Sequence, residues 1–249
     1  MQIQLIRSAT IRLNYAQRSF IIDPYLAAKF TRPSYTGKSP NPLVELPCTP
    51  LEAIAGIEMA LISHLHSDHF DPAAHELLPK DLSIHCQPQD QATIESMGFH
   101  NVIPVTDTLT WQGISITRTA CQHGSGAVLK DMGDASGFVL SAKNEPSIYW
   151  AGDTIWNEAV AGVIERIQPD IIITHSCGAE WGDHVLIVMD AEQTLAVCRA
   201  APNSTVVATH MEALDHATIT REDLRQYADA NGIGPERLLI PLDGETITF

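Results

Sequence analysis

The sequence is poor in basic residues, in paired cysteines and in long apolar stretches, and each shortage excludes a class of protein. Only 15 lysine and arginine residues stand against 30 aspartate and glutamate residues, so the formal net charge is −15. A chain this acidic repels phosphate backbones, and we therefore expect no nucleic-acid partner. The cysteines are odd in number and form no CxxC pair, which argues against a disulfide framework and favours a reducing compartment; they are Cys48, Cys86, Cys121, Cys177 and Cys198.

No apolar run is long enough to cross a bilayer, and the first seven residues lack a basic region followed by a long apolar core. These features predict a soluble, cytoplasmic protein without a membrane partner. The 249 residues are 45% hydrophobic, which favours one domain over residues 1–249. The sequence leaves open whether the chain forms a homo-oligomer.

Two passages of antiparallel strands and two passages of alternating strands and helices are predicted along the chain. Strands are expected at residues 2–6, 11–15 and 19–22, then strands and helices alternate from residue 59 to residue 104. Further strands follow between residues 108 and 150, and alternation returns in the remainder. This order by itself predicts an α/β or α+β fold. Residues 31–50 hold five prolines and little periodicity, which indicates a loop and, we infer, a flap beside the active site.

The densest group of reactive side chains is His64-Leu65-His66-Ser67-Asp68-His69, directly after the apolar run 59–63. Imidazole nitrogens and carboxylate oxygens are ligands that zinc and similar metals prefer. His64 and His66 can point the same way because strand side chains alternate with period two. A polar surface loop that is rich in histidine is the alternative, but the spacing and the preceding strand favour a metal site.

The HxHxDH pattern resembles the signature of the metallo-β-lactamase superfamily, which implies a four-layer αββα sandwich and metal-dependent hydrolysis. The segments Ser8-Ala9-Thr10 and Phe20-Ile21-Ile22-Asp23-Pro24 are similar to those of the branch that contains the ascorbate-phosphate lactonase. Arg7-Ser8 stand where that branch often has Gly-His. Asp23 is either an acceptor that orients a ligand histidine or a carboxylate in a turn at the end of a strand.

The resemblance also implies a ligand set for two metal ions. His123 follows the strand 114–120 and would complete the first site, while Asp153 follows the strand 147–150 and would bridge both ions. His210 follows the apolar strand 205–209, where the last ligand of the family lies. The implied ligands are His64, His66 and His123 for the first ion, and Asp68, His69 and His210 for the second, with Asp153 between them.

The other histidines have weaker claims to the site. Three compete with His210, and an ordinary surface role is slightly favoured for each: His175, His184 and His216. His216 is also near enough to His210 to hydrogen-bond a substrate or leaving group, so the candidate catalytic residues are Asp68 and His216. Three more lack ligand spacing and are expected at the surface or as caps: His75, His85 and His100.

The predicted activity is hydrolysis of a small-molecule ester, a lactone or phosphorylated lactone, by hydroxide from a water shared between two divalent cations. Nitrogen and carboxylate ligands favour zinc, with manganese or iron as alternatives. Two other functions stay open at this point. One is a phosphodiesterase or nuclease of the same superfamily, and the other is a metal-binding sensor without turnover.

Overall fold

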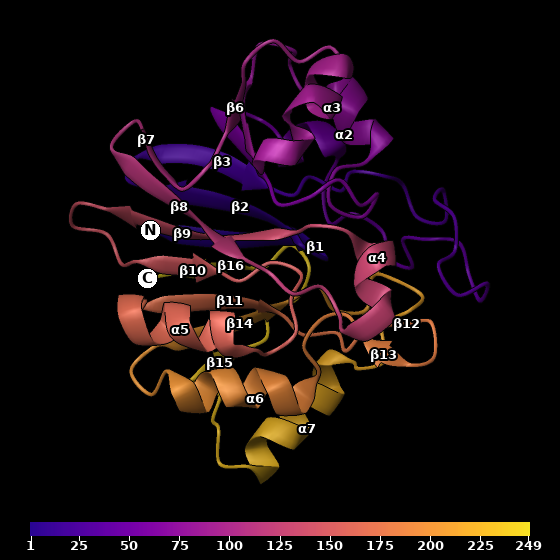
Figure 1. The fold of residues 1–249 in the computed structure, drawn as a ribbon, viewed down its shortest axis with the longest axis vertical. Coiled ribbons are helices and arrows are strands. Elements are labelled where there is room, and N and C mark those ends of the chain that lie inside the picture. Colours follow the sequence, from indigo (N-terminus) through magenta and orange to yellow (C-terminus); the bar gives the residue numbers. More distant parts are fainter.

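The computed structural model describes residues 1–249 and contains two seven-stranded sheets packed face to face (Figure 1). The first sheet has the spatial order β16 (Thr246–Thr248), β1 (Gln2–Arg7), β2 (Thr10–Tyr15), β3 (Arg18–Ile22), β4 (Met59–Ile62), β5 (Ser83–Cys86) and β6 (Val102–Pro104). The second has the order β15 (Leu238–Leu239), β14 (Thr205–Thr209), β11 (Ile171–His175), β10 (Ile148–Trp150), β9 (Ser136–Ala142), β8 (Ile114–Ala120) and β7 (Thr108–Trp111).

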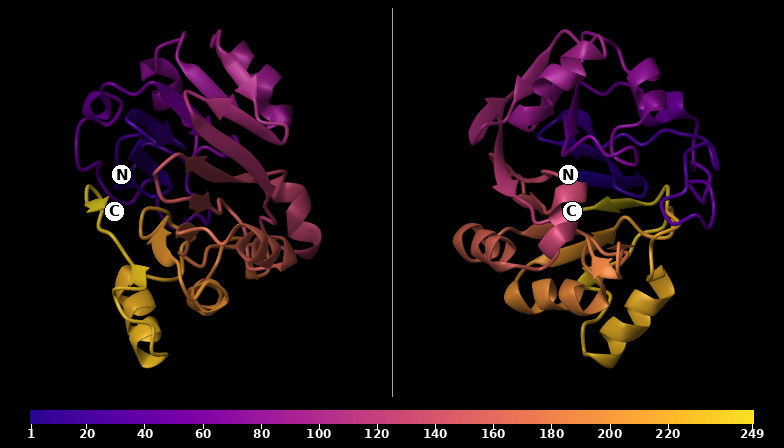
Figure 2. Two further views of the ribbon diagram at one scale, coloured as in Figure 1. Left: turned by 90° about the vertical axis from the view of Figure 1, so that its left-hand side faces the viewer. Right: turned by 45° about the vertical axis from the view of Figure 1, so that its right-hand side comes forward.

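Helices cover the outer face of each sheet, as Figures 1 and 2 show. The first sheet carries α2 (Pro72–Leu77) and α3 (Gln91–Ser96). The second carries α5 (Glu158–Ile167), α6 (Ala191–Ala200) and α7 (Arg221–Ala230). Shorter helical turns connect other elements: α1 (Pro50–Ala53), η1 (Pro88–Asp90), η2 (Gly126–Val128) and α4 (Leu129–Met132). The arrangement confirms the predicted four-layer αββα sandwich.

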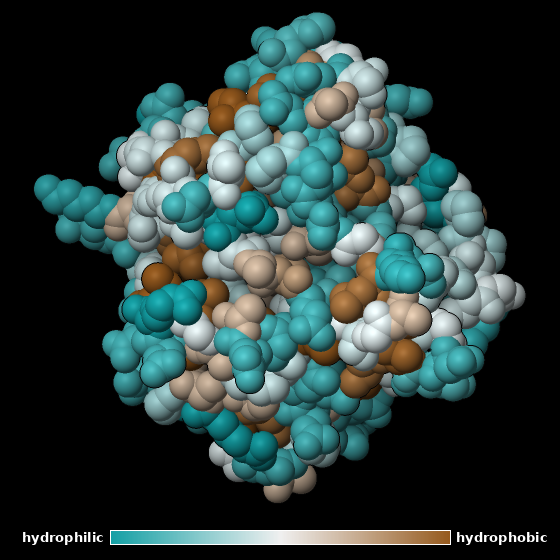
Figure 3. Space-filling view, in the orientation of Figure 1, coloured by the Kyte–Doolittle hydropathy of each residue, from teal (hydrophilic) through white to brown (hydrophobic).

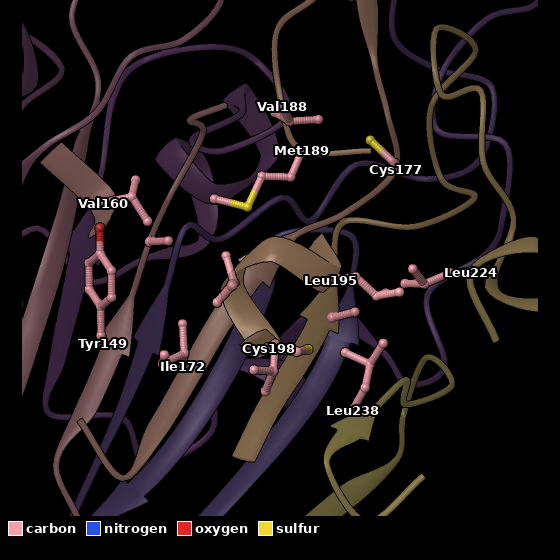
Figure 4. Close-up of a cluster of buried hydrophobic side chains, with 14 of the residues drawn as sticks. Tyr149, Val160, Ile172, Cys177, Val188, Met189, Leu195, Cys198, Leu224 and Leu238 are labelled. Carbon is pink, nitrogen blue, oxygen red and sulfur yellow. The ribbon is translucent and has the colours of Figure 1, made fainter. Parts of the chain in front are cut away.

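Three apolar cores lie between the four layers. The middle core joins the two sheets, with Phe20 from the first sheet and Trp150 from the second both fully buried. A second core lies between the first sheet and its helices. Figure 4 shows the third, in which Tyr149 and Ile172 of the second sheet pack with Leu195 of α6. Because both faces of each sheet are covered, all four residues of β4 are buried and its sequence is continuously apolar.

Helix starts follow ordinary capping chemistry. The Asp71 side chain accepts from the N–H groups of Ala73 and Ala74, and Pro72 occupies the first turn of α2. Asn157 caps α5 in the same way. The caps fix where each helix begins and therefore where the preceding loop ends.

Strand direction in the second sheet brings four loops to one edge. The strands β8 and β10 are each antiparallel to β9, so they run in the same direction. The strands β10, β11 and β14 are parallel neighbours. The carboxyl ends of β8, β10, β11 and β14 therefore lie at the same edge, and the loops after them meet there.

Two connecting segments contain short pieces of β-structure. A short hairpin of β12 (Glu180–Trp181) and β13 (Val185–Leu186) occupies the stretch after β11. The segment of residues 31–50 contains an isolated bridge between Arg32 and Asn41 and runs along the side of the sandwich (Figure 2). It contacts the second half of the chain, because the N–H of Leu43 donates to the carbonyl oxygen of Ala213.

On the face shown in Figure 3, hydrophilic residues predominate and hydrophobic ones form small separate patches. None of the helices combines the length and the apolar character that crossing a bilayer requires. A hollow lined by several of the reactive side chains lies at the edge where the four loops meet.

Candidate metal centre

The histidine-rich turn after β4 meets the loop after β8. His64 Nε2 lies 2.9 Å from His66 Nδ1, and His123 Nε2 lies 3.4 Å from the same nitrogen. The ligand atoms of these three residues are within 4.8 Å of one another. The structure thus brings together the three imidazoles predicted for the first ion.

A second group forms around the loops after β10, β11 and β14. It consists of His69, Asp153, His175 and His210, whose ligand atoms are also within 4.8 Å of one another. His69 Nε2 and His210 Nε2 are 3.3 Å apart. Asp68 lies beside this group, with its Oδ2 3.3 Å from His210 Nε2. Asp68, His69 and His210, predicted for the second ion, are therefore neighbours.

Asp153 lies between the two groups. Its Oδ2 is 3.3 Å from His123 Nε2 and 3.2 Å from His69 Nε2, so one oxygen faces an imidazole of each group. Its other oxygen, Oδ1, is 2.5 Å from His175 Nδ1. This position is the one that a bridging carboxylate requires. All seven predicted ligands are gathered within one buried cluster, where only His66 is partly exposed.

The hydrogen bonds on the outer side of the cluster indicate that it fits a cation. His69 Nδ1 lies 2.6 Å from Asp23 Oδ2, and His123 Nδ1 lies 2.8 Å from the carbonyl oxygen of Ile187. Both contacts need an N–H on the outer nitrogen, so the inner Nε2 of a neutral ring carries a lone pair. These lone pairs face Asp153 Oδ2, an arrangement that is repulsive unless a positive charge lies among them. Nitrogen and carboxylate donors in this arrangement suit a divalent metal.

Neighbouring carboxylates raise the pKa values of two histidines in the second group, His69 and His210. Burial alone lowers the pKa of His69, but the carboxylates of Asp153, Asp68 and Asp23 outweigh it and raise the pKa to about 10. Burial also lowers the pKa of His210, and Asp153 again outweighs it, so this pKa lies well above its ordinary value. In the first group, burial and neighbouring imidazoles hold the pKa of His64 well below its ordinary value.

Metal binding is therefore expected to release about two protons per chain at pH 7.5, one each from His69 and His210, because a ligand imidazole must be neutral. The sign follows from the raised pKa values: metal affinity rises with pH up to the pKa of His69, and it falls as the solution is acidified. Calorimetric titration of the metal-free protein with zinc, in buffers of different ionisation enthalpy, measures the number of protons released. A binding enthalpy that does not depend on the buffer would contradict the assignment.

The outer contacts also decide between the two interpretations of Asp23. This fully buried carboxylate accepts from the N–H and the hydroxyl of Ser63 at 2.8 and 2.6 Å, and from His69 Nδ1. It therefore orients His69, one of the predicted ligands, and does more than end a strand. His175 orients Asp153 in a similar way through the Nδ1 contact, while its buried Nε2 has no partner.

Three histidines predicted at the surface are buried instead: His85, His175 and His216, the last of which is 8% exposed. His175 and His85 are each only 1% exposed. The sequence does contain a feature that places His175 near the site: this residue ends the apolar strand β11, just as other site residues follow strands. His85 lies on β5 near Trp111, away from the cluster, and its burial explains why its pKa is lowered to about 4. His184 is exposed, as predicted, and pairs with Glu180.

A cavity of about 290 Å³ opens directly above the cluster. Metal-ligand candidates form its base, and two of its walls come from Tyr35 of the 31–50 segment and Trp181 of β12. His216, predicted as catalytic, also lines the cavity and is 8% exposed. The flap predicted for residues 31–50 thus does reach the site, through Tyr35. The remaining lining residues are Leu65, His66, Ser67, Asp68, His123, Asp131, Met132, Asp153 and Ile187.

The geometry can be compared with known proteins. Residues 18–211 match the model of the Beta-lactamase superfamily domain, which covers more than half of the chain. The chain belongs to this superfamily. It is 35% identical to the UPF0173 protein YddR of Bacillus subtilis over 255 residues, with 100% of both chains covered. It is 25% identical to a UPF0173 metal-dependent hydrolase of Xanthobacter autotrophicus, over 98% of this chain and 96% of the relative.

The match to YddR places this superfamily member in the UPF0173 family, and solved structures are similar to it along its whole length. A protein described as a possible metal-dependent hydrolase from Veillonella parvula shares 32% identity and a TM-score of 0.96, with 100% of this chain and 99% of that chain covered. An isothiocyanate hydrolase from Delia radicum gut bacteria shares 37% identity and a TM-score of 0.95, with the same coverage. The chain is thus a metal-dependent hydrolase of the beta-lactamase superfamily.

In this beta-lactamase superfamily member, Arg7 and Ser8 hold two segments of backbone in place, one before residues 31–50 and one at His210. The fully buried Arg7 guanidinium donates to the carbonyl oxygens of Tyr25 and Ala27 at 3.0 and 2.9 Å and fixes the start of the long loop segment. The carbonyl oxygen of Ser8 accepts from the N–H of His210 at 2.9 Å. His210 has a φ of 64°, and this backbone contact helps to hold that strained conformation beside the cluster.

Proposed function

We propose that this hydrolase acts on a small, uncharged electrophile with an apolar substituent, and that an isothiocyanate is its first candidate substrate. One observation carries the proposal. The cavity above the metal-ligand cluster has walls of Tyr35, Leu65, Met132, Trp181 and Ile187, and no lysine or arginine lines it. Apolar walls with a few polar groups at one end are typical of sites for small neutral molecules.

Two divalent cations would be held by the residues already described. These are His64, His66 and His123 on one side, Asp68, His69 and His210 on the other, and Asp153 between them. When bound, such a pair of cations lowers the pKa of a shared water toward about 7 and polarises the electrophile. We propose zinc, because the donors are imidazole and carboxylate groups and include no thiolate, and manganese or iron would suit the same donors.

Two side chains at the cavity wall can contact the substrate. Tyr35 presents a hydroxyl group, which in the free protein donates to Asp68 Oδ1 at 3.0 Å. Burial lowers the pKa of His216 to about 4, so its imidazole is neutral at physiological pH. His216 Nδ1 is buried and has no hydrogen-bond partner. His216 itself lines the cavity, so a bound substrate can contact its ring.

Hydrolysis of an isothiocyanate consumes one water molecule and proceeds in two steps. Water adds across the C=N bond, with its oxygen on the central carbon and a proton on nitrogen, to give a thiocarbamic acid. Cleavage of the C–N bond then gives R–NH2 and O=C=S. The substrate is neutral and its reactive carbon is small and exposed, so the apolar cavity can bind the substituent while the carbon faces the ligand cluster. The similarity to an isothiocyanate hydrolase at 37% identity supports this choice.

Esters and lactones are the second candidate class, since a neutral lactone needs the same combination of apolar walls and a metal-activated water. A phosphorylated lactone suits the cavity less well, because phosphate is ordinarily held by an arginine or lysine. The same argument, together with the net charge of −15, disfavours a nuclease or phosphodiesterase. The partner we propose is accordingly a small molecule.

A substrate panel tests the proposal. Zinc-loaded protein is offered butyl isothiocyanate, a neutral lactone, a phosphorylated lactone and bis(4-nitrophenyl) phosphate, and amine, acid or nitrophenol release is measured. We expect kcat/KM for the isothiocyanate to exceed that for either phosphorylated compound by at least ~10²-fold, since the charged groups find no cationic partner. Preference for a phosphorylated substrate would overturn the proposal. Preference for the lactone would replace the first candidate with the second.

A further inference from the structure

The carboxylate of Asp215 is surrounded by donors from one distant segment. It accepts from the backbone N–H groups of Tyr35 and Thr36 at 3.0 and 3.1 Å, and from the Thr36 hydroxyl at 2.7 Å. The Ser34 hydroxyl and the Asn41 amide, the latter at 2.9 Å, also donate to it. The N–H of Asp215 donates in return to Asn41 Oδ1 at 2.9 Å. None of these atoms belongs to the two groups of predicted metal ligands.

These contacts fix residues 34–41, which have no helix and only one isolated bridge of their own. Asp215 is 7% exposed, and four residues of the segment converge on its single side chain. A carboxylate that is hydrogen-bonded by five donors is a strong tether, because removing it leaves each donor without its partner. The surrounding hydroxyls and amides accordingly hold the pKa of Asp215 well below its ordinary value, despite the opposing effect of burial.

The tether determines where Tyr35 lies. The Tyr35 ring meets the His216 ring edge-on, with centroids 4.8 Å apart. Its hydroxyl lies 2.9 Å from Ser67 Oγ and 3.0 Å from Asp68 Oδ1. His216 directly follows Asp215 in the chain, so one residue positions both rings, Tyr35 through the segment and His216 through the backbone.

The Tyr35–His216 pair stands between two hollows. The inner one is the cavity above the ligand cluster, and the outer one is a groove of about 480 Å³. Both are lined by Tyr35, Trp181 and His216, which are the only residues they share. The outer groove is more polar, and its other lining residues are Thr36, Lys38, Glu180, Gly182, His184 and Thr218.

We propose that Asp215 is a positioning residue that holds Tyr35 against His216, and that this pair of rings limits the length of the substituent that the inner cavity accepts. The proposal rests on the proposed function for the class of substrate. A short apolar substituent fits within the inner cavity. A long one must displace the rings or pass into the polar groove, and it then loses the favourable contribution that each buried methylene makes.

The test uses a homologous series of n-alkyl isothiocyanates from ethyl to decyl. In the natural sequence, kcat/KM is expected to rise with chain length and then to fall for the longest members through a higher KM. Tyr35→Ala removes the ring and should raise the decyl-to-butyl ratio of kcat/KM by about tenfold, the equivalent of two buried methylenes. Tyr35→Phe keeps the ring without its hydroxyl, so the ratio should stay within about twofold of the original even if the rates change.

Asp215→Ala should reproduce the altered ratio of Tyr35→Ala, and it should speed hydrogen exchange of the amides in residues 34–41 by at least about tenfold. Thr36→Val removes one donor and should give a smaller change of the same sign. Ser39→Ala is the matched control, because the Ser39 hydroxyl contacts only the carbonyl oxygen of Pro40. In this control, the hydrogen exchange of residues 34–41 and the decyl-to-butyl ratio of kcat/KM should both stay unchanged.

Two readouts do not depend on turnover. Hydrogen exchange reports on the tether directly, and calorimetric binding of n-alkyl hydroxamates of the same lengths to the zinc-loaded protein reports on the length limit. If no isothiocyanate is hydrolysed, the proposed function fails while these two measurements still decide the role of Asp215. Unchanged exchange in Asp215→Ala, or an unchanged length preference in Tyr35→Ala, overturns the proposal. If Asp215→Ala does not fold, Thr36→Val and Tyr35→Ala decide it.

Discussion

Replacing Asp153 with alanine is expected to abolish tight metal binding at both ligand groups and to lower kcat/KM by ~10³-fold or more. Asp153 Oδ2 faces His123 of the first group and His69 of the second, so its loss removes a donor from both. Changing a residue that only supports a ligand typically costs about 10–100-fold in affinity or activity, and loss of a shared ligand should cost more. Elemental analysis after dialysis gives the number of metal ions per chain, and the isothiocyanate assay gives the rate.

Asp131→Ala is the matched control for this experiment. Asp131 is a second carboxylate that lines the same cavity, and it contacts the indole N–H of Trp181 without reaching the ligand groups. Its replacement should leave the metal content unchanged. Normal metal content in Asp153→Ala, in protein whose circular dichroism shows an intact fold, would remove Asp153 from the ligand set.

Asp23→Ala is expected to weaken zinc binding by about 10–100-fold without removing any ligand, because His69 loses the acceptor that fixes its orientation. The change also leaves the N–H and hydroxyl of Ser63 without their partner in a fully buried site. Buried donors left unpaired cost about 1–3 kcal/mol each, so the free energy of unfolding should fall as well. Competition with a chelator measures the affinity, and chemical denaturation of the metal-free protein measures the stability.

Asp90→Ala separates these two effects. Asp90 is another buried carboxylate, and its bond is to the amide of Gln87 and not to a ligand histidine. We expect some loss of stability but unchanged affinity for zinc. Equal affinities in Asp23→Ala and the natural sequence would show that the Asp23–His69 contact has no part in metal binding.

The sequence predicts the layers of this fold well because each layer is encoded locally. Strand alternation, the continuously apolar β4 and the cap at Asp71 all act over a few residues, and the structure agrees with each. The HxHxDH turn is local too. The order of strands and their shared direction then place His123, Asp153 and His210 near it.

The features that sequence reasoning missed depend on contacts between distant residues. The sequence predicts that residues 31–50 lie beside the site, but it does not show that Asp215, 180 positions from Tyr35, holds them there, because no local pattern records such a contact. The strands of the β12–β13 hairpin have two residues each, which is too short for alternation to be visible. His85 is buried because Trp111 of the other sheet covers it. His175 is different, since the sequence alone shows that it lies at the end of an apolar strand, as other site residues do.

The order of the ligands along the chain has a consequence for biosynthesis. His64 to His69 leave the ribosome long before His210, and the second sheet that carries Asp153 and His210 must form in between. The first sheet itself is completed only by β16, which follows every predicted ligand in the sequence. A nascent chain that has not yet reached His210 can therefore offer an ion only a partial set of the predicted donors.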